Sequence, residues 1–297
     1  MMKHKSIFKA SFEESLNLED DDFRKLNQKS YNSAEKYFQN GGPSFKFKLI
    51  YALLSLFCPI GLSFMFALMT KLAQEDNAKF GFQVLKIDFH PMLVFYILLA
   101  VWLLLIVLGK YFYQTFILVY RLQFHAQFTS ILWVVIEFNL LFIPLLEPTL
   151  TSYGMGALLI FLVGLGVTMA KSQQRHLQAL LYGVKSQPDF FEKSLKFIAT
   201  YGLGLLGLGV LIRWFLKIFS VGLSDSLEQL GLIATWFILD IGVLAFFIFV
   251  LTSHFLPAYY KLKYPEEYRN WEGKTVEEWY GKKYLKRHKE LLKKEKE

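Results

Sequence analysis

The sequence is poor in cysteine and in charge. Among 297 residues there is one cysteine, Cys58, and only 20% of the residues are charged. A lone cysteine excludes an intrachain disulfide and a cysteine-based metal cluster. No two histidines stand four residues apart, and no H-E-x-x-H, P-loop or G-x-S-x-G sequence occurs, so no local motif indicates a metal site, a bound nucleotide or a nucleophile elbow. We therefore expect neither a cofactor nor an enzyme.

The sequence has long apolar runs instead. Apolar residues make up 54% of the chain, and a run of about 20 of them crosses roughly 30 Å of hydrocarbon as a helix. In lipid the backbone must satisfy its own hydrogen bonds, which such runs do as helices. We therefore expect an all-α integral membrane protein with six transmembrane helices. The predicted spans cover residues 49–70, 91–109, 129–146, 148–170, 195–215 and 230–253.

Basic residues are concentrated on one side of the membrane in this predicted topology. Segments on the side of the termini hold 28 Lys and Arg, against 5 on the other side. Because cytoplasmic segments carry the excess of Lys and Arg, both termini are expected in the cytoplasm. Residues 1–48 then form a cytoplasmic N-terminal segment, 49–256 a six-helix transmembrane domain and 257–297 a cytoplasmic tail. The polar first 45 residues lack a cleavable signal peptide, and the predicted location is the cell membrane, of a bacterial plasma-membrane type.

Both predicted cytoplasmic ends contain helix signals. Three aspartates at 20–22 precede apolar residues at helical spacing up to Phe38, which predicts an amphipathic helix on the inner leaflet or under the bundle, or a docking helix for a partner. The tail is basic, aromatic and helical, with a capping box at Thr275-x-x-Glu278. Its proximity to a span makes anionic lipid of the inner leaflet the expected partner, rather than nucleic acid.

Glycines at 202, 204 and 207 match the dinucleotide fingerprint G-x-G-x-x-G, but they lie inside a predicted span where no solvated turn forms. Small residues in spans let helices approach closely. The residues assigned to helix packing are Gly166, Ala170, Thr200, Gly204 and Gly207.

Two acidic residues lie in predicted spans. Glu137 and Asp240 are both roughly 14–15 Å from the outer ends of their helices, close to the bilayer midplane. Acids at this depth are costly and usually face the bundle interior, so together with Asn139 they are candidates for an intramembrane polar or ion site. If the two acids approach one another, they would share a proton. The structural alternative is an acid hydrogen-bonded across helices to Asn139 or Thr235.

The expected function is transport. The chain would be either a small secondary carrier or the permease subunit of an exporter whose ATPase is a separate chain; the alternative is a non-transporting scaffold, assembly factor or immunity-type protein. Self-association into a homo-oligomer fits either class.

Overall fold

The computed structural model describes residues 5–19, 29, 32, 44–75, 84–86, 90–109, 114–183 and 225–291. The described chain is helical, with no strand in these ranges. It contains four helices that are long and apolar enough to cross a membrane: Lys48–Glu75, Pro91–Gly109, Thr115–Leu181 and Gln229–Lys263. The all-α membrane architecture is therefore as expected. The predicted span 195–215, with Thr200, Gly204 and Gly207, lies outside the described residues, as does nearly all of the predicted amphipathic helix.

The first two spans follow the uncharged runs. The helices α3 (Phe45–Ser55) and α4 (Leu62–Glu75) are joined by a π-helical segment, Leu56–Gly61, which contains Pro59. Proline has no N–H for the helical ladder, which explains the local change of helical pitch. The next helix, α6, covers Pro91–Gly109, the range predicted from the sequence. Its last carbonyl, on Gly109, accepts a hydrogen bond of 2.6 Å from the Arg121 guanidinium.

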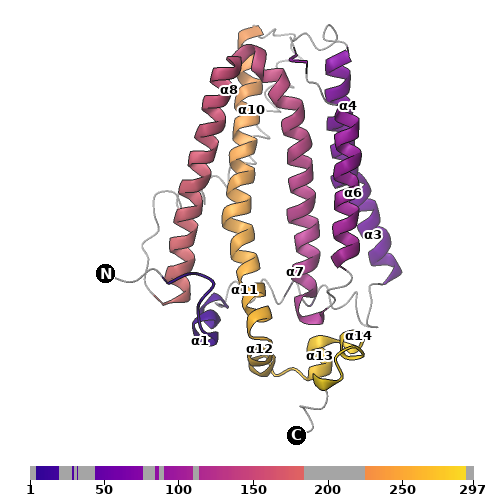
Figure 1. Ribbon diagram of the computed structural model, residues 1–297, viewed down its shortest axis with the longest axis vertical. Coiled ribbons are helices and arrows are strands. Elements are labelled where there is room, and N and C mark those ends of the chain that lie inside the picture. The colour runs from indigo at the N-terminus through magenta and orange to yellow at the C-terminus, as the bar shows by residue number, and fades with distance from the viewer. Residues whose placement is uncertain are drawn as a thin grey trace.

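A helical hairpin forms the centre of the chain. After α7 (Leu118–Gln123), α8 runs from Ser130 to Leu181, but Thr151 has non-helical angles (φ 61°, ψ 160°). The chain turns back there, so a first arm (130–150) and a second arm (152–181) run in opposite directions along the bundle (Figure 1). Pro148 has no N–H for the carbonyl of Pro144, one turn earlier, and the backbone N–H of Leu85 takes that carbonyl at 3.0 Å.

The last long helix packs against both arms of this hairpin. It comprises α10 (Asp225–Ala245), a π-helical segment Phe246–Leu251 and α11 (Thr252–Lys263). Trp236 of α10 is fully buried among side chains that include Phe142 of the first arm and Leu162 of the second. Gln173 of the second arm donates to the Ser253 hydroxyl at 2.7 Å. The membrane part is therefore held by apolar contacts with a few polar cross-links.

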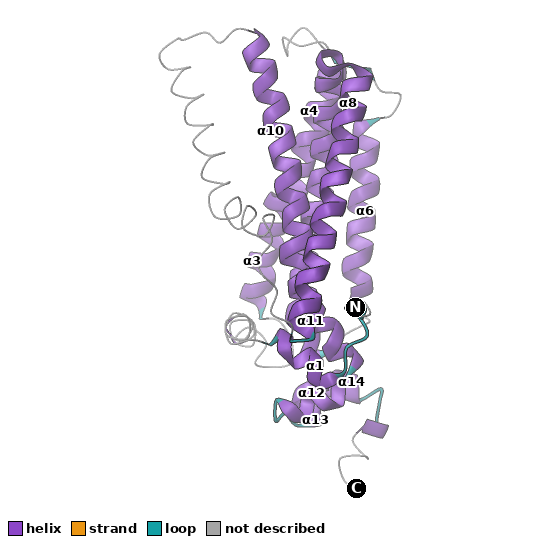
Figure 2. Ribbon diagram, turned by 90° about the vertical axis from the view of Figure 1, so that its left-hand side faces the viewer, coloured by secondary structure: helices purple, strands orange, loops and turns teal. Residues whose placement is uncertain are grey.

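Both ends of the described chain meet at one end of the bundle (Figure 2). Here α1 (Phe12–Ser15), the second arm of α8 and the tail helices α12 (Pro265–Trp271), α13 (Val276–Tyr280) and α14 (Lys282–Leu285) contribute to one apolar cluster. We call this unit the cap. It is formed by residues 5–19, 114–117, 177–182 and 256–291.

The cap has the core of a water-soluble protein, whereas the bundle is apolar on its outside. Trp279 is 1% and Tyr268 0% exposed, while Phe45 and Phe57 of the first span are 78% and 73% exposed. Large exposed apolar side chains are expected where lipid is the solvent. The capping box predicted at the start of α13 is present, because the Thr275 N–H donates to Glu278 at 2.9 Å and the Glu278 N–H to the Thr275 hydroxyl at 3.3 Å.

Candidate intramembrane polar site

Asn139 links the first arm of α8 to α10. Its amide donates to a carboxyl oxygen of Asp240 at 3.1 Å, and its oxygen accepts from the Trp236 indole N–H at 2.9 Å. The same amide nitrogen lies 3.0 Å from the Val135 carbonyl on its own helix. Asn139 can therefore satisfy one acid and one indole at the same time, which is the hydrogen-bonded alternative that the sequence left open for Asp240. Thr235, the other partner considered, donates to the Gly231 carbonyl of its own helix.

Glu137 lies on a different side of the same helix. Side chains two positions apart in an α-helix point about 200° away from each other around the helix axis. Glu137, two positions before Asn139, therefore cannot point in the same direction as Asn139. Glu137 instead continues a buried stripe with Trp133 and Leu141, one turn before and one turn after. The structure therefore brings Asn139, and not Glu137, against Asp240. The shared proton considered for the two acids has no support in this geometry.

The side chain of Glu137 is fully buried, and neither carboxyl oxygen makes a hydrogen bond of normal geometry with a described residue, although the Trp133 indole N–H approaches it. A buried polar group without a partner costs about 1–3 kcal/mol. Such groups are rare in native proteins, and each one needs an explanation. The first arm of α8 packs here against α4 and α6, and these two helices form the surroundings of the Glu137 side chain.

The face of α4 towards α8 is lined with small residues. Ser63, Ala67 and Thr70 recur at helical spacing and are each 2% exposed or less. Ala67 packs in one cluster with Trp133, and the Phe66 and Phe138 rings, 5.7 Å apart, place α4 beside the first arm at the level of Glu137. Small side chains allow the close helix contact that buries the carboxyl so completely.

Three buried hydrogen-bond donors lie on α4, α6 and the first arm, the three helices that pack together here. The Ser63 hydroxyl and the indole N–H groups of Trp102 and Trp133 have no hydrogen-bond partner among the described residues. The two indoles are 5.7 Å apart, and Trp133 is one turn from Glu137. A carboxylate accepts hydrogen bonds, and a carboxylic acid can also donate one. These donors are therefore suited to receive Glu137 when it is ionised. We call Ser63, Trp102, Trp133 and Glu137 the Glu137 cluster.

Other predicted positions have less distinctive surroundings. A Cβ added at Gly166 would lie 3.9 Å from Leu244 of α10, so this glycine does mark a helix contact. Ala170 is exposed, and the buried residue of that turn is Met169. Sequence reasoning missed Trp133 and Trp236, whose indole N–H groups inside apolar spans were the available signal.

The cap contains a buried ion-pair network. The Lys261 ammonium lies 2.9 Å from Glu272 and 3.6 Å from Glu19, and 5.8 Å from the Tyr268 ring centre. Burial opposes ionisation of Glu272, but the ammonium groups of Lys261 and Lys274 outweigh it and hold the pKa of that carboxyl below its usual value. Burial raises the pKa of Tyr268 to about 12. Lys261 thus ties the N-terminal segment to the tail.

Comparisons with protein-family models, with curated proteins and with solved structures find no match for this chain.

Proposed function

We propose that this chain is a six-span membrane protein with both termini in the cytoplasm, and that it acts as a small secondary carrier coupled to protons or cations. The excess of Lys and Arg on the sides of the termini supports the orientation. The position of residues 5–19 and 256–291 at one end of the bundle is consistent with it (Figure 2).

One observation carries the transport proposal: the carboxyl of Glu137 is fully buried in the bundle and makes no hydrogen bond of normal geometry with any residue that the structure describes. A purely structural acid would be expected to have a partner, as Asp240 has in Asn139. An acid that takes up and releases a proton, or that pairs with a passing cation, instead needs free bonding capacity in one of its states. The neighbouring donors of the Glu137 cluster support the ionised state.

A self-contained carrier is favoured over the permease subunit of an ATPase. The permease interpretation needs exposed aromatic surface after the second span and on the tail. Phe116 instead stacks on Trp279 with ring centres 4.7 Å apart, and both are buried in the cap. Two of the aromatic side chains that could dock an ATPase are therefore used within the chain itself.

Everted membrane vesicles test this proposal. Cells producing the protein are broken to give vesicles, in which respiration forms a proton gradient. A panel of small organic cations, amino acids and peptides is then added, and a pH-sensitive dye reports the gradient. A compound that dissipates the gradient in wild-type vesicles should have no effect with Glu137→Gln. Tyr153→Phe, at a 92% exposed site, is the matched control and should act as wild type. Equal dissipation by Glu137→Gln and wild type would contradict the assignment.

The scaffold alternative predicts a different set of results. A scaffold should tolerate Glu137→Leu in any cellular assay of its role, and a pull-down in nanodiscs should recover a stoichiometric partner. Recovery of an ATPase chain would instead favour the permease subunit. A carrier should be recovered alone or as a homo-oligomer.

A further inference from the structure

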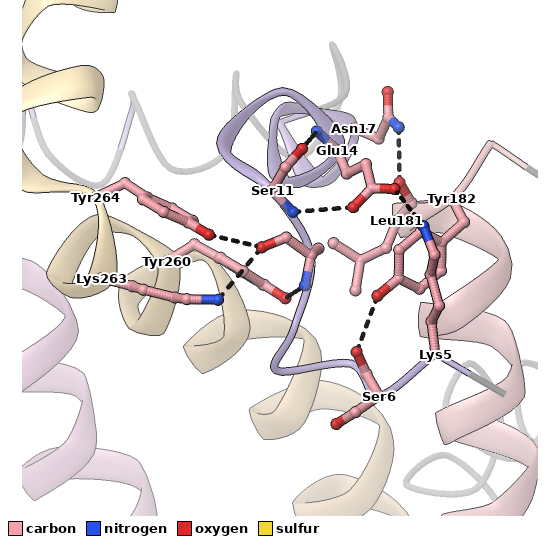
Figure 3. Close-up of polar contacts among 11 residues, drawn as sticks. Lys5, Ser6, Ser11, Glu14, Asn17, Leu181, Tyr182, Tyr260, Lys263 and Tyr264 are labelled. Carbon is pink, nitrogen blue, oxygen red and sulfur yellow. Dashed lines mark hydrogen bonds and ion pairs between the residues drawn. The ribbon is translucent and has the colours of Figure 1, made fainter.

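The N-terminal residues of the cap are held in an unusual way. Residues 5–19, which we call the strap, contain one turn closed by the Lys9 N–H on the Ser6 carbonyl at 3.1 Å, followed by α1 and a short 3₁₀ turn. The strap has its own local order, because Ser11 and Glu14 form a complete capping box. It lies between the end of the second arm of α8 and the helices α11 and α12 (Figure 3).

Side chains of the groove bind the backbone of the strap along residues 6–10. The carbonyls of residues 6, 7, 8 and 10 each accept at least one hydrogen bond from a tyrosine hydroxyl or a lysine ammonium. The donors are Tyr182 to Ser6 (2.9 Å), Tyr260 to Ile7 (2.5 Å), Tyr259 and Lys263 to Phe8 (3.2 and 3.0 Å), and Lys263 and Tyr264 to Ala10 (3.3 and 2.9 Å).

Tyr260 is central to this arrangement. Its hydroxyl donates to the Ile7 carbonyl and accepts from the Ala10 N–H at 3.1 Å, so that one side chain fixes two backbone groups three residues apart. Gln178 adds a hydrogen bond to the Lys5 carbonyl at 2.9 Å. Recognition through backbone groups is how many proteins bind peptide segments, with pockets for a few side chains adding selectivity.

The groove has such pockets. Ala10 is fully buried, so a larger side chain would have to displace its neighbours, while Ile7 is 9% and Leu18 4% exposed. The Phe12 ring meets Tyr268 edge to face at 5.1 Å. Lys9, which precedes the buried Ala10, is exposed and makes no contribution to this selectivity.

The walls of the groove share one apolar cluster with the strap. Leu177 and Leu181 of α8 and Leu256 and Tyr268 of the tail belong to it together with Ile7, Ala10 and Leu18. Deeper in the bundle, the hydrogen bond from Gln173 to Ser253 connects the same two elements. The second arm of α8 and α11 are therefore also connected by a contact that involves no residue of the strap.

We propose that this groove is a peptide-binding site and that the strap is its intramolecular, exchangeable ligand. The ligand class is a peptide with a turn and free carbonyls at the positions of residues 6–10, and with a small residue at the position of Ala10. This inference is independent of the carrier proposal, since it involves none of the Glu137 cluster.

A cut chain tests the proposal without removing any residue. A protease site is placed within residues 33–43, and the purified protein in nanodiscs is cleaved and passed over a sizing column. The N-terminal fragment should remain with the bundle and should be displaced by an excess of a fluorescent peptide of residues 5–19. In the uncut protein the tethered strap should block the peptide.

Variants decide which contacts carry the binding. Tyr260→Phe should weaken peptide binding by roughly tenfold or more, since it removes both backbone contacts of that hydroxyl. Lys286→Gln, at an exposed site of the cap, is the matched control and should leave binding unchanged. In the peptide, Ala10→Leu should abolish binding and Lys9→Ala should not affect it.

Three results would overturn the proposal. The fragment could leave as soon as the chain is cut, with no binding of added peptide. It could resist saturating peptide, which would make the strap a permanent part of the fold. Uncut and cut protein could also bind the peptide equally well, which would show that the strap does not fill the groove.

Discussion

Replacing Glu137 by leucine should stabilise the protein, whereas the same change at Asn139 should destabilise it. Glu137 is a buried acid without a hydrogen-bond partner in the described part of the chain, so an apolar side chain of similar size removes the cost of burying it. Asn139 holds the Asp240 carboxyl and the Trp236 indole, so Asn139→Leu leaves two buried polar groups unpaired.

The magnitudes follow from the number of groups involved. One unpartnered buried polar group costs about 1–3 kcal/mol, so Glu137→Leu should raise the free energy of unfolding by about that amount. Interhelical hydrogen bonds in membranes have measured strengths averaging about 0.6 and reaching about 1.7 kcal/mol. The loss of two of them predicts about 1–3 kcal/mol of destabilisation for Asn139→Leu.

The two free energies are measured by titrating the protein in bicelles with sodium dodecyl sulfate and following helix content by circular dichroism. The vesicle assay on the same variants gives activity, which should be absent for Glu137→Leu despite its higher stability. Loss of activity with a gain in stability is typical of a functional residue. Destabilisation by Glu137→Leu of more than about 1 kcal/mol would reveal a structural partner for this acid and would refute the reasoning.

Three further predictions concern the cap. Gly281 has φ 80°, and an added Cβ would collide with the Thr115 side chain, so Gly281→Ala should raise hydrogen exchange throughout α13, while Gly273→Ala, at φ 65° with open space, should cost only about 1 kcal/mol. Phe116→Ala removes a buried ring and should lower cap stability by about 3–5 kcal/mol, measured by hydrogen exchange. The lowered pKa of Glu272 gives stability that is present above its unfolded pKa near 4.5 and is lost as pH falls below that value. The raised pKa of Tyr268 gives stability that is present below pH 10 and is lost between pH 10 and about 12. Tryptophan fluorescence measured against pH checks both limits, and Glu272→Gln should abolish the loss of stability at acid pH.

The helical spans could be predicted because a segment in lipid must satisfy its backbone hydrogen bonds within itself, which it does as a helix. The run at 91–109 became α6 with the same bounds, since no charge or proline inside it offered another end point. The run at 49–70 became the longer helical stretch Lys48–Glu75, because helices continue past the hydrocarbon where polar side chains meet water. The turn of the hairpin lies at Thr151, inside the predicted fourth span, rather than at residue 147. Pro148 removes only its own hydrogen bond to the Pro144 carbonyl, so the helix continues past it as far as the turn.

The intramembrane site was only partly predictable. Depth along a helix follows from counting residues, and it identified Glu137, Asn139 and Asp240 as buried polar positions. Which of them meet depends on how α8 and α10 rotate against each other, and a pattern within one helix does not encode that rotation. The angle of about 200° between Glu137 and Asn139 in fact allowed only one of them to face Asp240.

Local patterns predicted the capping box of α13 but not the packing of the cap. The tail aromatics alternate with lysines, which indicated contact with lipid headgroups, yet Tyr260 and Tyr268 are fully buried against residues about 250 positions earlier in the chain. Contacts over such separations leave no periodic signal. Lys261 is buried in the ion-pair network of the cap, whereas Lys282 and Lys286 are exposed, so the predicted contact with anionic lipid rests on exposed lysines of this kind.

The strap and the interhelical hydrogen bond of Gln173 connect the same two elements, the second arm of α8 and α11. Gln173 joins the second arm of α8 to the Ser253 region inside the bundle, and the strap joins the ends of those elements through Tyr182 and Tyr260. If the carrier proposal holds, opening towards the cytoplasm requires these ends to separate, because the cap closes that side. Tyr260→Phe should then change the rate of transport while the dependence on Glu137 stays intact, since the two sites share no residue. A rate unchanged by Tyr260→Phe, in a protein whose strap is shown to exchange, would place the opening between other helices.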